Sequence, residues 1–338
     1  MSFKVLVITP SLAAHGGVRV LVEHANGLAR QGHDVTLQVV HKPERALPDW
    51  VSFDDDVEIQ SGAIKYNPSK FDAVIYGSPF LAVQFHNHYK DANTFLLLQM
   101  CEELFNPDNK AYVQQAIESY HLPIPIIGIS QWNKDRILTE HKRDPNLPYY
   151  LIGNGVSDNF CPGVKDEGLT VLVEGWVGYN PAKDTEAIAP RVALHLKQKY
   201  GARIIAYSQF PLSHPQAKFK DVPDEYYVQP TAEQIVRLNQ RATFLLKASH
   251  YDARSCAPVE AMKCGTPTVR AIDLGDDDLL GGYNCVRCRY DYSQMIALSE
   301  LVIEGSVLPK LQLNGLEYAK TNLSWPHWSN ELYKIIKG

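Results

Sequence analysis

The chain has 338 residues, of which 45% are hydrophobic and 21% are charged, and its formal net charge is -5. This length suits two domains of about 150 residues each, and the composition is that of an ordinary globular protein. The charge excludes the strongly basic balance of a protein whose main partner is nucleic acid. No stretch approaches the roughly 18 apolar residues of a membrane span, so at most peripheral membrane contact is expected.

The first apolar run and the cysteines indicate where the protein works. Residues 5–9 are too short a run for the core of a signal peptide, and they predict a first buried strand instead. Six cysteines are scattered through the chain, which is typical of a reducing compartment. A cytoplasmic protein is therefore expected.

The first half of the chain alternates short apolar runs with amphipathic stretches. This alternation is typical of a parallel sheet with helices on both faces. The predicted strands are 4–9, 35–40, 73–76, 94–98, 124–129 and 149–152, and the predicted helices are 18–31, 110–120 and 131–141.

The second half repeats the pattern after a polar stretch, 157–168, that contains Pro162 and Gly163. The predicted fold class is therefore α/β, with two doubly wound Rossmann-like domains at 1–160 and 165–322, followed by a helix at 323–338. The predicted strands are 170–174, 203–207, 226–228, 243–247, 268–271 and 284–287, and the predicted helices are 184–199, 231–241, 259–264 and 292–304.

Two open parallel sheets predict where ligands bind. Such sheets hold ligands outside the carboxyl ends of their strands, and a pair of them offers the cleft between the domains as the natural site. The first candidate loop follows residue 9 and reaches Gly16 and Gly17 before a helix. Paired glycines allow backbone amides to approach a ligand, and a helix N-terminus favours an anion, although an ordinary strand-to-helix turn gives the same pattern.

The second candidate loop is HYDARSCAPVEAMKCGTPTV, residues 250–269. A strand is expected to end near 249, with Asp252 in the loop, Pro258 in the first helical turn and Glu260 in that same turn. The amides from about Cys256 to Glu260 would then suit a phosphate. Alternatively, Glu260 only compensates the helix dipole and Asp252 only stabilises a turn. Spacing does not choose between these interpretations.

An acid, seven residues and then Glu-Ala-Met-x-Cys-Gly-Thr-Pro resembles the E-x7-E pattern of retaining glycosyltransferases of the GT-B fold, in particular glycosyltransferase family 4. Further segments resemble that family in the same order, so the resemblance covers nearly the whole chain. They are the Gly-Gly loop and helix at 14–37, Ile129-Ser130 before a helix, the hinge-like Asn154-Gly155-Val156, the strand and loop at 171–184, and residues 284–291. Residues 95–105, FLLLQMCEELF, are similar to a Q-x-x-E-x-F stretch of some rhamnosyltransferase-like members.

The resemblance implies roles for individual residues. Glu260 would bind the ribose hydroxyls of a nucleotide-diphosphate sugar, Asp252 would face the donor sugar, and Lys183 would stabilise the leaving diphosphate. Gly16, Gly17 and the amides of Cys256 and Ala257 would complete the anion site. The second domain would bind the donor, the first would bind the acceptor, and the terminal helix, with Trp325 and Trp328, would pack back on the first.

The chain departs from the family pattern at two positions. Asp252 stands where the family usually has Glu, and Trp176 stands where the family has an Arg that precedes the Lys. Arg254 is the candidate to replace this missing phosphate-binding charge. On the acceptor side, Gln99, Glu102 and Glu103 follow a strand of the first domain and are expected to face the cleft, and His15 is a candidate because it sits beside the paired glycines. The resemblance implies that the leaving phosphate can itself accept the acceptor proton, so a protein base is not required.

Other chemistry-bearing residues are given ordinary interpretations. Cys285 and Cys288 form a single C-x-x-C, a weak zinc motif without a second pair. His86 and His88 can share a strand face, and residues 276–278, Asp-Asp-Asp, are expected in a solvated loop. Neither a metal nor another cofactor is expected.

The sequence therefore predicts a glycosyltransferase that uses a nucleotide-diphosphate sugar and transfers a hexosyl or deoxyhexosyl group to a hydroxyl of a glycan, a lipid-linked glycan or a small molecule. A UDP-sugar is favoured over GDP- and dTDP-sugars. Two alternatives are a GT-B nucleotide-sugar epimerase, which needs no acceptor, and a nucleotide-sugar-binding protein without catalysis.

Overall fold

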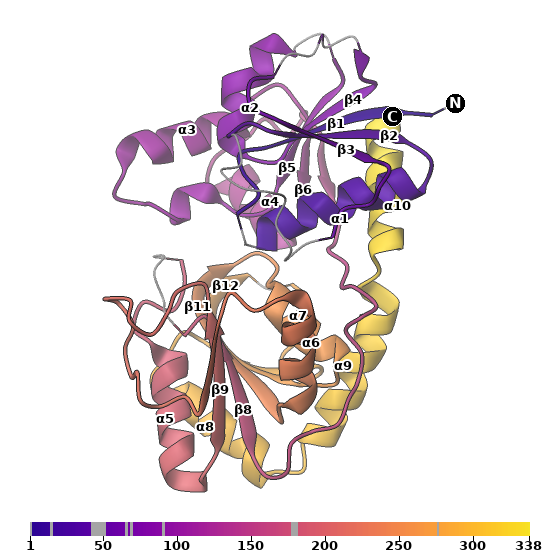
Figure 1. The fold of residues 1–338 in the computed structure, drawn as a ribbon. Coiled ribbons are helices and arrows are strands. Elements are labelled where there is room, and N and C mark those ends of the chain that lie inside the picture. The colour runs from indigo at the N-terminus through magenta and orange to yellow at the C-terminus, as the bar shows by residue number, and fades with distance from the viewer. Residues whose placement is uncertain are drawn as a thin grey trace. The chain divides into compact units, whose positions relative to one another are not determined.

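The structure is a computed structural model, and it describes residues 2–13, 16–41, 52–64, 67, 70–89, 92–176, 182–275 and 277–338. The chain divides into two compact units. Unit 1 comprises Met1–Gly155 and Trp325–Gly338, and unit 2 comprises Val156–Ser324. Each unit is built on its own sheet with helices around it (Figure 1).

Unit 1 contains a parallel sheet with the strand order β3-β2-β1-β4-β5-β6-β7. The order reverses between β1 and β4, which are hydrogen-bonded neighbours, so the chain winds outward in both directions from this pair. The strands are β1 (Lys4–Thr9), β2 (Asp34–Val39), β3 (Val57–Ser61), β4 (Ala73–Tyr76), β5 (Thr94–Leu98), β6 (Ile126–Gly128) and β7 (Tyr149–Leu151). The helices are α1 (Gly16–Arg30), α2 (Pro79–Phe85), α3 (Lys110–Tyr120), α4 (Gln131–Thr139) and α10 (Trp325–Lys337), with short 3-10 helices η2 (His86–His88) and η3 (Glu102–Leu104).

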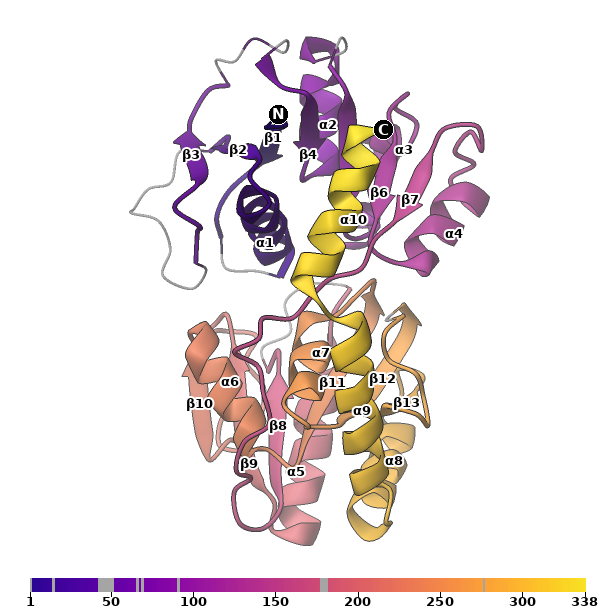
Figure 2. The same cartoon turned by 90° about the vertical axis from the view of Figure 1, so that its right-hand side faces the viewer.

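The last helix, α10, lies along α1 within unit 1 (Figure 2). The two helices approach closely because α1 carries a glycine at the contact: a Cβ added to Gly27 would lie 2.1 Å from the Ser329 Oγ. The buried ring of His24 meets the ring of Trp325 edge to face, with centroids 5.3 Å apart. These contacts explain why residues 325–338 belong to unit 1 although unit 2 precedes them in the sequence.

Unit 2 contains a second parallel sheet with the order β10-β9-β8-β11-β12-β13. Here the order reverses between β8 and β11, which pair through Leu246 and Val173. The strands are β8 (Thr170–Glu174), β9 (Arg203–Ser208), β10 (Glu225–Val228), β11 (Phe244–Asp252), β12 (Thr268–Gly275) and β13 (Cys285–Cys288). The helices are α5 (Ile188–Tyr200), α6 (Ala232–Arg241), α7 (Cys256–Lys263), α8 (Tyr292–Glu304) and α9 (Leu308–Asn322).

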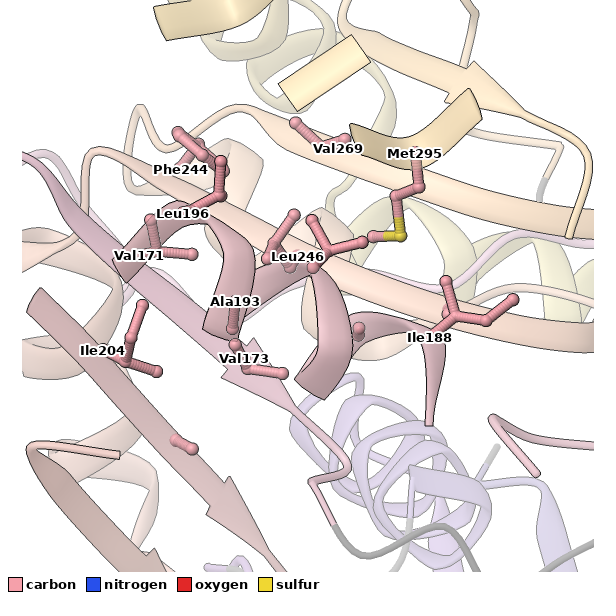
Figure 3. Packing of buried hydrophobic residues seen from close by; sticks show 14 of the residues in the cluster. Val171, Val173, Ile188, Ala193, Leu196, Ile204, Phe244, Leu246, Val269 and Met295 are labelled. Atoms are coloured by element: carbon pink, nitrogen blue, oxygen red, sulfur yellow. The ribbon is translucent and has the colours of Figure 1, made fainter. Parts of the chain in front are cut away.

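Helices cover both faces of this sheet, and the side chains of successive strand residues point to opposite faces. Val171 and Val173 of β8 pack in one cluster with residues of α5 and α8, and Figure 3 shows members of this cluster, among them Leu196 and Met295. Leu172, between them, packs instead with residues of α6 and α7. Apolar residues buried on both faces produce the continuous hydrophobic runs from which the strands were predicted.

Several helices begin where the local sequence provides a cap. Thr231 and Gln234 form a reciprocal capping box at α6, and the side chains of Asp291 and Ser130 accept backbone N–H groups at the starts of α8 and α4. Gly201 ends α5 in the left-handed conformation, at φ 65°. These caps account for where α4, α6 and α8 begin and where α5 ends.

The sequence-based predictions miss some elements. β3, α2 and α9 were not predicted, and His86 and His88 lie in η2 rather than in a strand. The strand expected to end near residue 249 continues as β11 to Asp252, because it pairs with β12 as far as Asp252 and Gly275. Among the described residues, no helix has both the length and the apolar character needed to cross a bilayer.

Candidate functional site

The candidate site in unit 2 lies where the strand order reverses, at the carboxyl ends of β8 and β11. This position is the usual ligand site of an open parallel sheet. Asp252 is the last residue of β11, not a loop residue as predicted, and only 9% of its surface is exposed. Its Oδ2 accepts from the Lys183 Nζ at 3.1 Å and lies 3.4 Å from the Arg270 Nη2. The structure therefore brings together two of the predicted residues, Lys183 and Asp252, and adds a third.

The carboxyl group of Asp252 is held in its ionised form. Burial opposes ionisation, but the positive charges of Lys183, Lys247 and Arg270 outweigh it and lower the pKa of Asp252 well below its usual range. The hydroxyl of Ser249 also lies 3.5 Å from the same oxygen. Asp252 is consequently a fixed negative charge at any pH near neutrality.

Lys183 lies in a loop that is held by hydrogen bonds from the residues on either side of it. The Tyr251 N–H donates to the carbonyl of Ala182 at 3.0 Å, which fastens the loop to β11. On the other side, Asp184 accepts the first backbone N–H groups of α5, from Ile188 at 2.7 Å and from Ala189 at 2.9 Å. Lys183 thus lies between a strand and a helix start, and its half-exposed side chain remains accessible to a ligand.

The helix that carries Glu260 begins earlier than predicted. α7 starts at Cys256 with Ser255 as its N-cap residue, so Glu260 is in the second turn and the first turn contains no acid. Pro258 is tolerated because the first four N–H groups of a helix have no partner within it. The prediction that Glu260 lies in the first turn is wrong. An acid in the second turn is too far from the helix start for compensation of the helix dipole to explain its presence. Its side chain is buried, at 5% exposure.

Cys256 and Ala257, predicted to offer backbone amides to a phosphate, are the first two residues of α7. Ser255 makes no side-chain cap hydrogen bond to this helix. Its Oγ instead lies 3.2 Å from the Arg270 Nη2, and Ser255 is itself buried. The cap residue therefore connects the helix start to the sheet below it.

Arg254, the candidate for a missing phosphate-binding charge, forms an ion pair with Asp278. Its Nε and Nη2 donate to the two carboxylate oxygens of Asp278, and the Tyr318 hydroxyl donates to Asp278 Oδ1 at 2.6 Å. Asp278 is 2% exposed, so the prediction of a solvated loop fails for this residue, while Asp276 lies outside the described residues. Trp176, at the position of the expected Arg, is a core residue whose Nε1 donates to the carbonyl of Lys218.

Sequence reasoning missed four residues that shape this site. Lys247 and Arg270 are buried cations inside predicted strands, and Glu174 accepts a hydrogen bond from the Lys247 Nζ. A charge within an apolar strand of a central sheet was the available signal. Gly275 is the fourth: at φ 103°, it leaves room for the Asp252 carbonyl oxygen, which would lie 1.8 Å from an added Cβ.

The Gly275→Ala variant is expected to disturb the site more than an ordinary left-handed glycine replacement would. Its methyl group must push the end of β12 away from Asp252, whereas Gly282, at φ 78°, has no atom within 4 Å of an added Cβ. Urea unfolding should show a loss for Gly275→Ala that exceeds the loss for Gly282→Ala by about 1–3 kcal/mol. Equal losses would mean that the contact with Asp252 does not constrain this glycine.

In unit 1, the structure brings Gln99 to the paired glycines. Gly16 and Gly17 are the first residues of α1, and the Gln99 Nε2 donates to the carbonyl of Gly17 at 2.9 Å. Gln99 directly follows β5, so the end of this strand is tied to the start of α1. His15 lies outside the described residues.

The two acids after β5 differ in their environments. Burial raises the pKa of Glu102 to about 7, although the Tyr112 hydroxyl donates to its Oε2 at 3.3 Å. Burial also opposes ionisation of Glu103, but bonds with His141, Tyr120 and Arg136 outweigh it and lower the pKa to about 2. Glu103, at 5% exposure, is thus an internal ion-pair residue of unit 1, and the expectation that it faces a ligand is wrong.

No group of three or more His, Cys, Asp or Glu side chains in the described part of the chain is arranged to hold a metal ion. All six cysteines are free thiols, including the C-x-x-C pair Cys285 and Cys288 in β13.

The fold is that of the GT-B glycosyltransferases, two Rossmann-like α/β domains, which confirms the predicted fold class. Sucrose-phosphate synthase from Thermosynechococcus elongatus has a TM-score of 0.79 at 11% identity, over 98% of both chains. Anabaena HepE in complex with UDP-glucose has a TM-score of 0.75 at 12% identity, over 98% of this chain and 99% of that one. WaaG, a glycosyltransferase involved in lipopolysaccharide biosynthesis, has a TM-score of 0.72 at 13% identity, over 99% of this chain and 100% of that one. No protein-family model and no curated protein matches the chain, so the likeness extends to the fold alone.

Proposed function

We propose that this protein is a glycosyltransferase of the retaining type, similar to family 4, that transfers a sugar from a nucleotide-diphosphate donor to an acceptor hydroxyl. The observation that carries the proposal is the group formed by Lys183, Asp252 and the start of α7 at the reversal point of the unit 2 sheet. A cation, an ionised carboxylate and a helix N-terminus together suit a phosphate that is linked to a hydroxyl-rich sugar.

Each donor-side residue has a role in this proposal. Lys183 contacts the diphosphate, and the amides of Cys256 and Ala257 bind its oxygens. Glu260 accepts hydrogen bonds from the ribose hydroxyls, and Asp252 faces the donor sugar. When the bond between the anomeric carbon and the diphosphate breaks, the leaving group gains negative charge, which Lys183 and the helix start stabilise.

The acceptor is proposed to bind unit 1, near Gly16, Gly17, Gln99 and Glu102, with His15 on the same loop. The new bond joins the acceptor oxygen to the anomeric carbon on the face that the diphosphate leaves. The proton of the acceptor hydroxyl passes to the departing phosphate oxygen, so Glu102 serves to bind the acceptor and no protein base is needed. The acceptor is a glycan, a lipid-linked glycan or a small molecule.

A UDP-hexose or UDP-deoxyhexose is the proposed donor, ahead of GDP- and dTDP-sugars. Support comes from HepE, a structural neighbour whose solved structures contain UDP-glucose, or UDP and glucose. The free thiols of all six cysteines support a cytoplasmic site of action. A net charge of -5 gives no support for a nucleic-acid partner.

The test is a screen of UDP-, GDP- and dTDP-sugars with candidate acceptors, in which free nucleotide and glycosylated product are both measured. Glu260→Ala should raise the donor KM by about 10–100-fold, because a charged acceptor of two ribose hydrogen bonds is lost. Glu233→Ala, which removes an exposed acid of α6 in the same unit, is the control and should change nothing.

The products also separate the alternatives. An epimerase would convert the donor without an acceptor, and a binding protein would hold a donor with no turnover on any acceptor. Unchanged turnover in Glu260→Ala would overturn the assignment of the site, and a product of inverted anomeric configuration would overturn the retaining mechanism.

A further inference from the structure

A row of charged side chains crosses the middle of the unit 2 sheet, on the face covered by α6 and α7. Lys247 of β11 and Arg270 of β12 are directly opposite each other in the parallel register. Glu174, at the end of β8, accepts a hydrogen bond from the Lys247 Nζ. Lys247 is 6% exposed and Arg270 is 0% exposed, so both charges lie inside the protein. Buried cations in a central sheet are costly unless they are paired, and they are seldom retained for packing alone.

The guanidinium of Arg270 joins three residues of the candidate donor site. Its Nη1 lies 3.2 Å from the Ser249 Oγ, and its Nη2 lies 3.4 Å from Asp252 Oδ2 and 3.2 Å from the Ser255 Oγ. Asp252 ends β11 and Ser255 is the N-cap residue of α7. One buried side chain therefore connects the end of the strand to the start of the helix.

The charged residues of the row also determine how much positive charge surrounds Asp252. Lys183 and Arg270 both lie within salt-bridge distance of Asp252, and Lys247 pairs with Glu174. Trp176 occupies the position where the resemblance implies an Arg, and the guanidinium of Arg254 is paired with Asp278. Within the described part of the sheet, Lys247 of β11 and Arg270 of β12 supply positive charge close to Asp252.

We infer that Arg270 is a positioning residue of the donor site: it fixes the Asp252 carboxylate and the N-cap residue of α7 from beneath. The inference rests on the proposed function. Because Arg270 is wholly buried, it acts through Asp252 and Ser255 and does not touch the substrate. Lys247, paired with Glu174, lies on the same strand as Asp252, and its positive charge also favours the ionised Asp252 carboxylate.

The test compares Arg270→Met, Arg270→Lys and wild type in donor binding, by calorimetry with the nucleotide sugar found in the screen, and in kcat. Arg270→Met is expected to weaken donor binding and to lower kcat, together by about 10–100-fold. Arg270→Lys keeps the charge and should recover most of the loss. Arg143→Met is the matched control, since Arg143 is equally buried, lies in unit 1 and donates to backbone carbonyls; it should lower stability and leave donor binding within twofold.

A double-mutant cycle with Asp252→Asn separates positioning from a merely structural role. If Arg270 acts through Asp252, then Arg270→Met should weaken donor binding much less in the Asp252→Asn background than in wild type. Equal losses in the two backgrounds, or an Arg270→Lys variant as weak as Arg270→Met, would overturn the inference. Ser255→Ala gives a second measure if Arg270→Met does not fold, and it should weaken donor binding by a few fold; unchanged binding would also count against the inference.

These outcomes are distinguishable from a failure of the proposed function. If the wild-type protein binds no nucleotide and transfers no sugar, the proposed function fails, and this inference fails with it. If the wild type is active and Arg270→Met binds and turns over the donor normally, only the role of Arg270 is wrong.

Discussion

Replacing Lys183 with methionine is expected to lower kcat for sugar transfer by about 10²–10³-fold. Among the donor-side residues predicted from the sequence, Lys183 has a flexible cationic side chain that is partly exposed, and it sits 3.1 Å from Asp252 at the carboxyl end of β11. The negative charge on the leaving diphosphate grows as the glycosidic bond breaks, so losing a nearby cation raises the barrier more than it weakens ground-state binding. Methionine keeps much of the length and apolar stem of lysine without its charge.

Lys197→Met is the matched control for this experiment. Its side chain is 34% exposed against 37% for Lys183, and it belongs to α5 of the same unit, where it pairs with Asp224. Steady-state kinetics with a saturating acceptor should show wild-type kcat for Lys197→Met. A Lys183→Met enzyme within twofold of wild type would remove Lys183 from the chemistry, and equal losses in both variants would point to a general effect of surface charge.

Replacing Asp252 with asparagine is expected to destabilise the fold as well as abolish most activity. Asparagine is almost the same shape, but it leaves Arg270 and Lys247 buried with one carboxylate fewer. Removing one partner of a buried ion pair costs about 3–5 kcal/mol, because the remaining charge stays desolvated. The free energy of unfolding in urea should fall by this amount at neutral pH, where Asp252 is ionised in the folded protein.

Asp273→Asn provides the comparison for this stability measurement. Asp273 is an acid of the neighbouring strand β12, but its side chain is 38% exposed, and its contacts are with the ring of His250 and the backbone N–H of Tyr290. Exposed pairs of this kind contribute about 0–1 kcal/mol. If Asp252→Asn is no more destabilising than Asp273→Asn, the row of charges in the sheet does not depend on Asp252.

The sheets were largely predictable from the sequence, because their strands are apolar on both faces. The runs at 4–9, 73–76, 94–98 and 170–174 coincide with β1, β4, β5 and β8. The exception is β3, whose sequence VEIQS alternates polar with apolar residues and whose burial is only partial. Edge strands carry a weak apolar signal, and their pairing depends on a neighbour that local sequence does not reveal.

The candidate site was predictable in part. Lys183 and Asp252 come together as the resemblance implied, although they are 69 positions apart in the sequence. The sequence did not reveal which charged residues pair with each other when they are far apart in the chain. Arg254 pairs with Asp278, and Arg270, within the predicted strand 268–271, lies 3.4 Å from the Asp252 carboxylate.

Local boundaries were the other source of error, and they changed the interpretation of two acids. The end of β11 is polar, so the apolar pattern did not predict that the strand continues to Asp252. This last part of the strand is stabilised by its pairing with β12. Pro258 correctly indicated a nearby helix start, but α7 begins at Cys256, three positions before the predicted start at residue 259, since proline is tolerated throughout the first turn. Glu260 consequently moves to the second turn, which leaves ligand binding as its main proposed role.

The most direct test of the central claim is hydrogen–deuterium exchange of the wild-type protein with and without the nucleotide sugar that it binds. The proposal predicts slower exchange of the amides from Tyr251 to Val259 and around Lys183, with no comparable effect at the far end of the sheet near Arg203 and Asp224. The same protection should be lost in Lys183→Met and retained in Lys197→Met. Protection confined to other strands, or none at a saturating nucleotide-sugar concentration, would contradict the assignment of a donor site to β11 and α7.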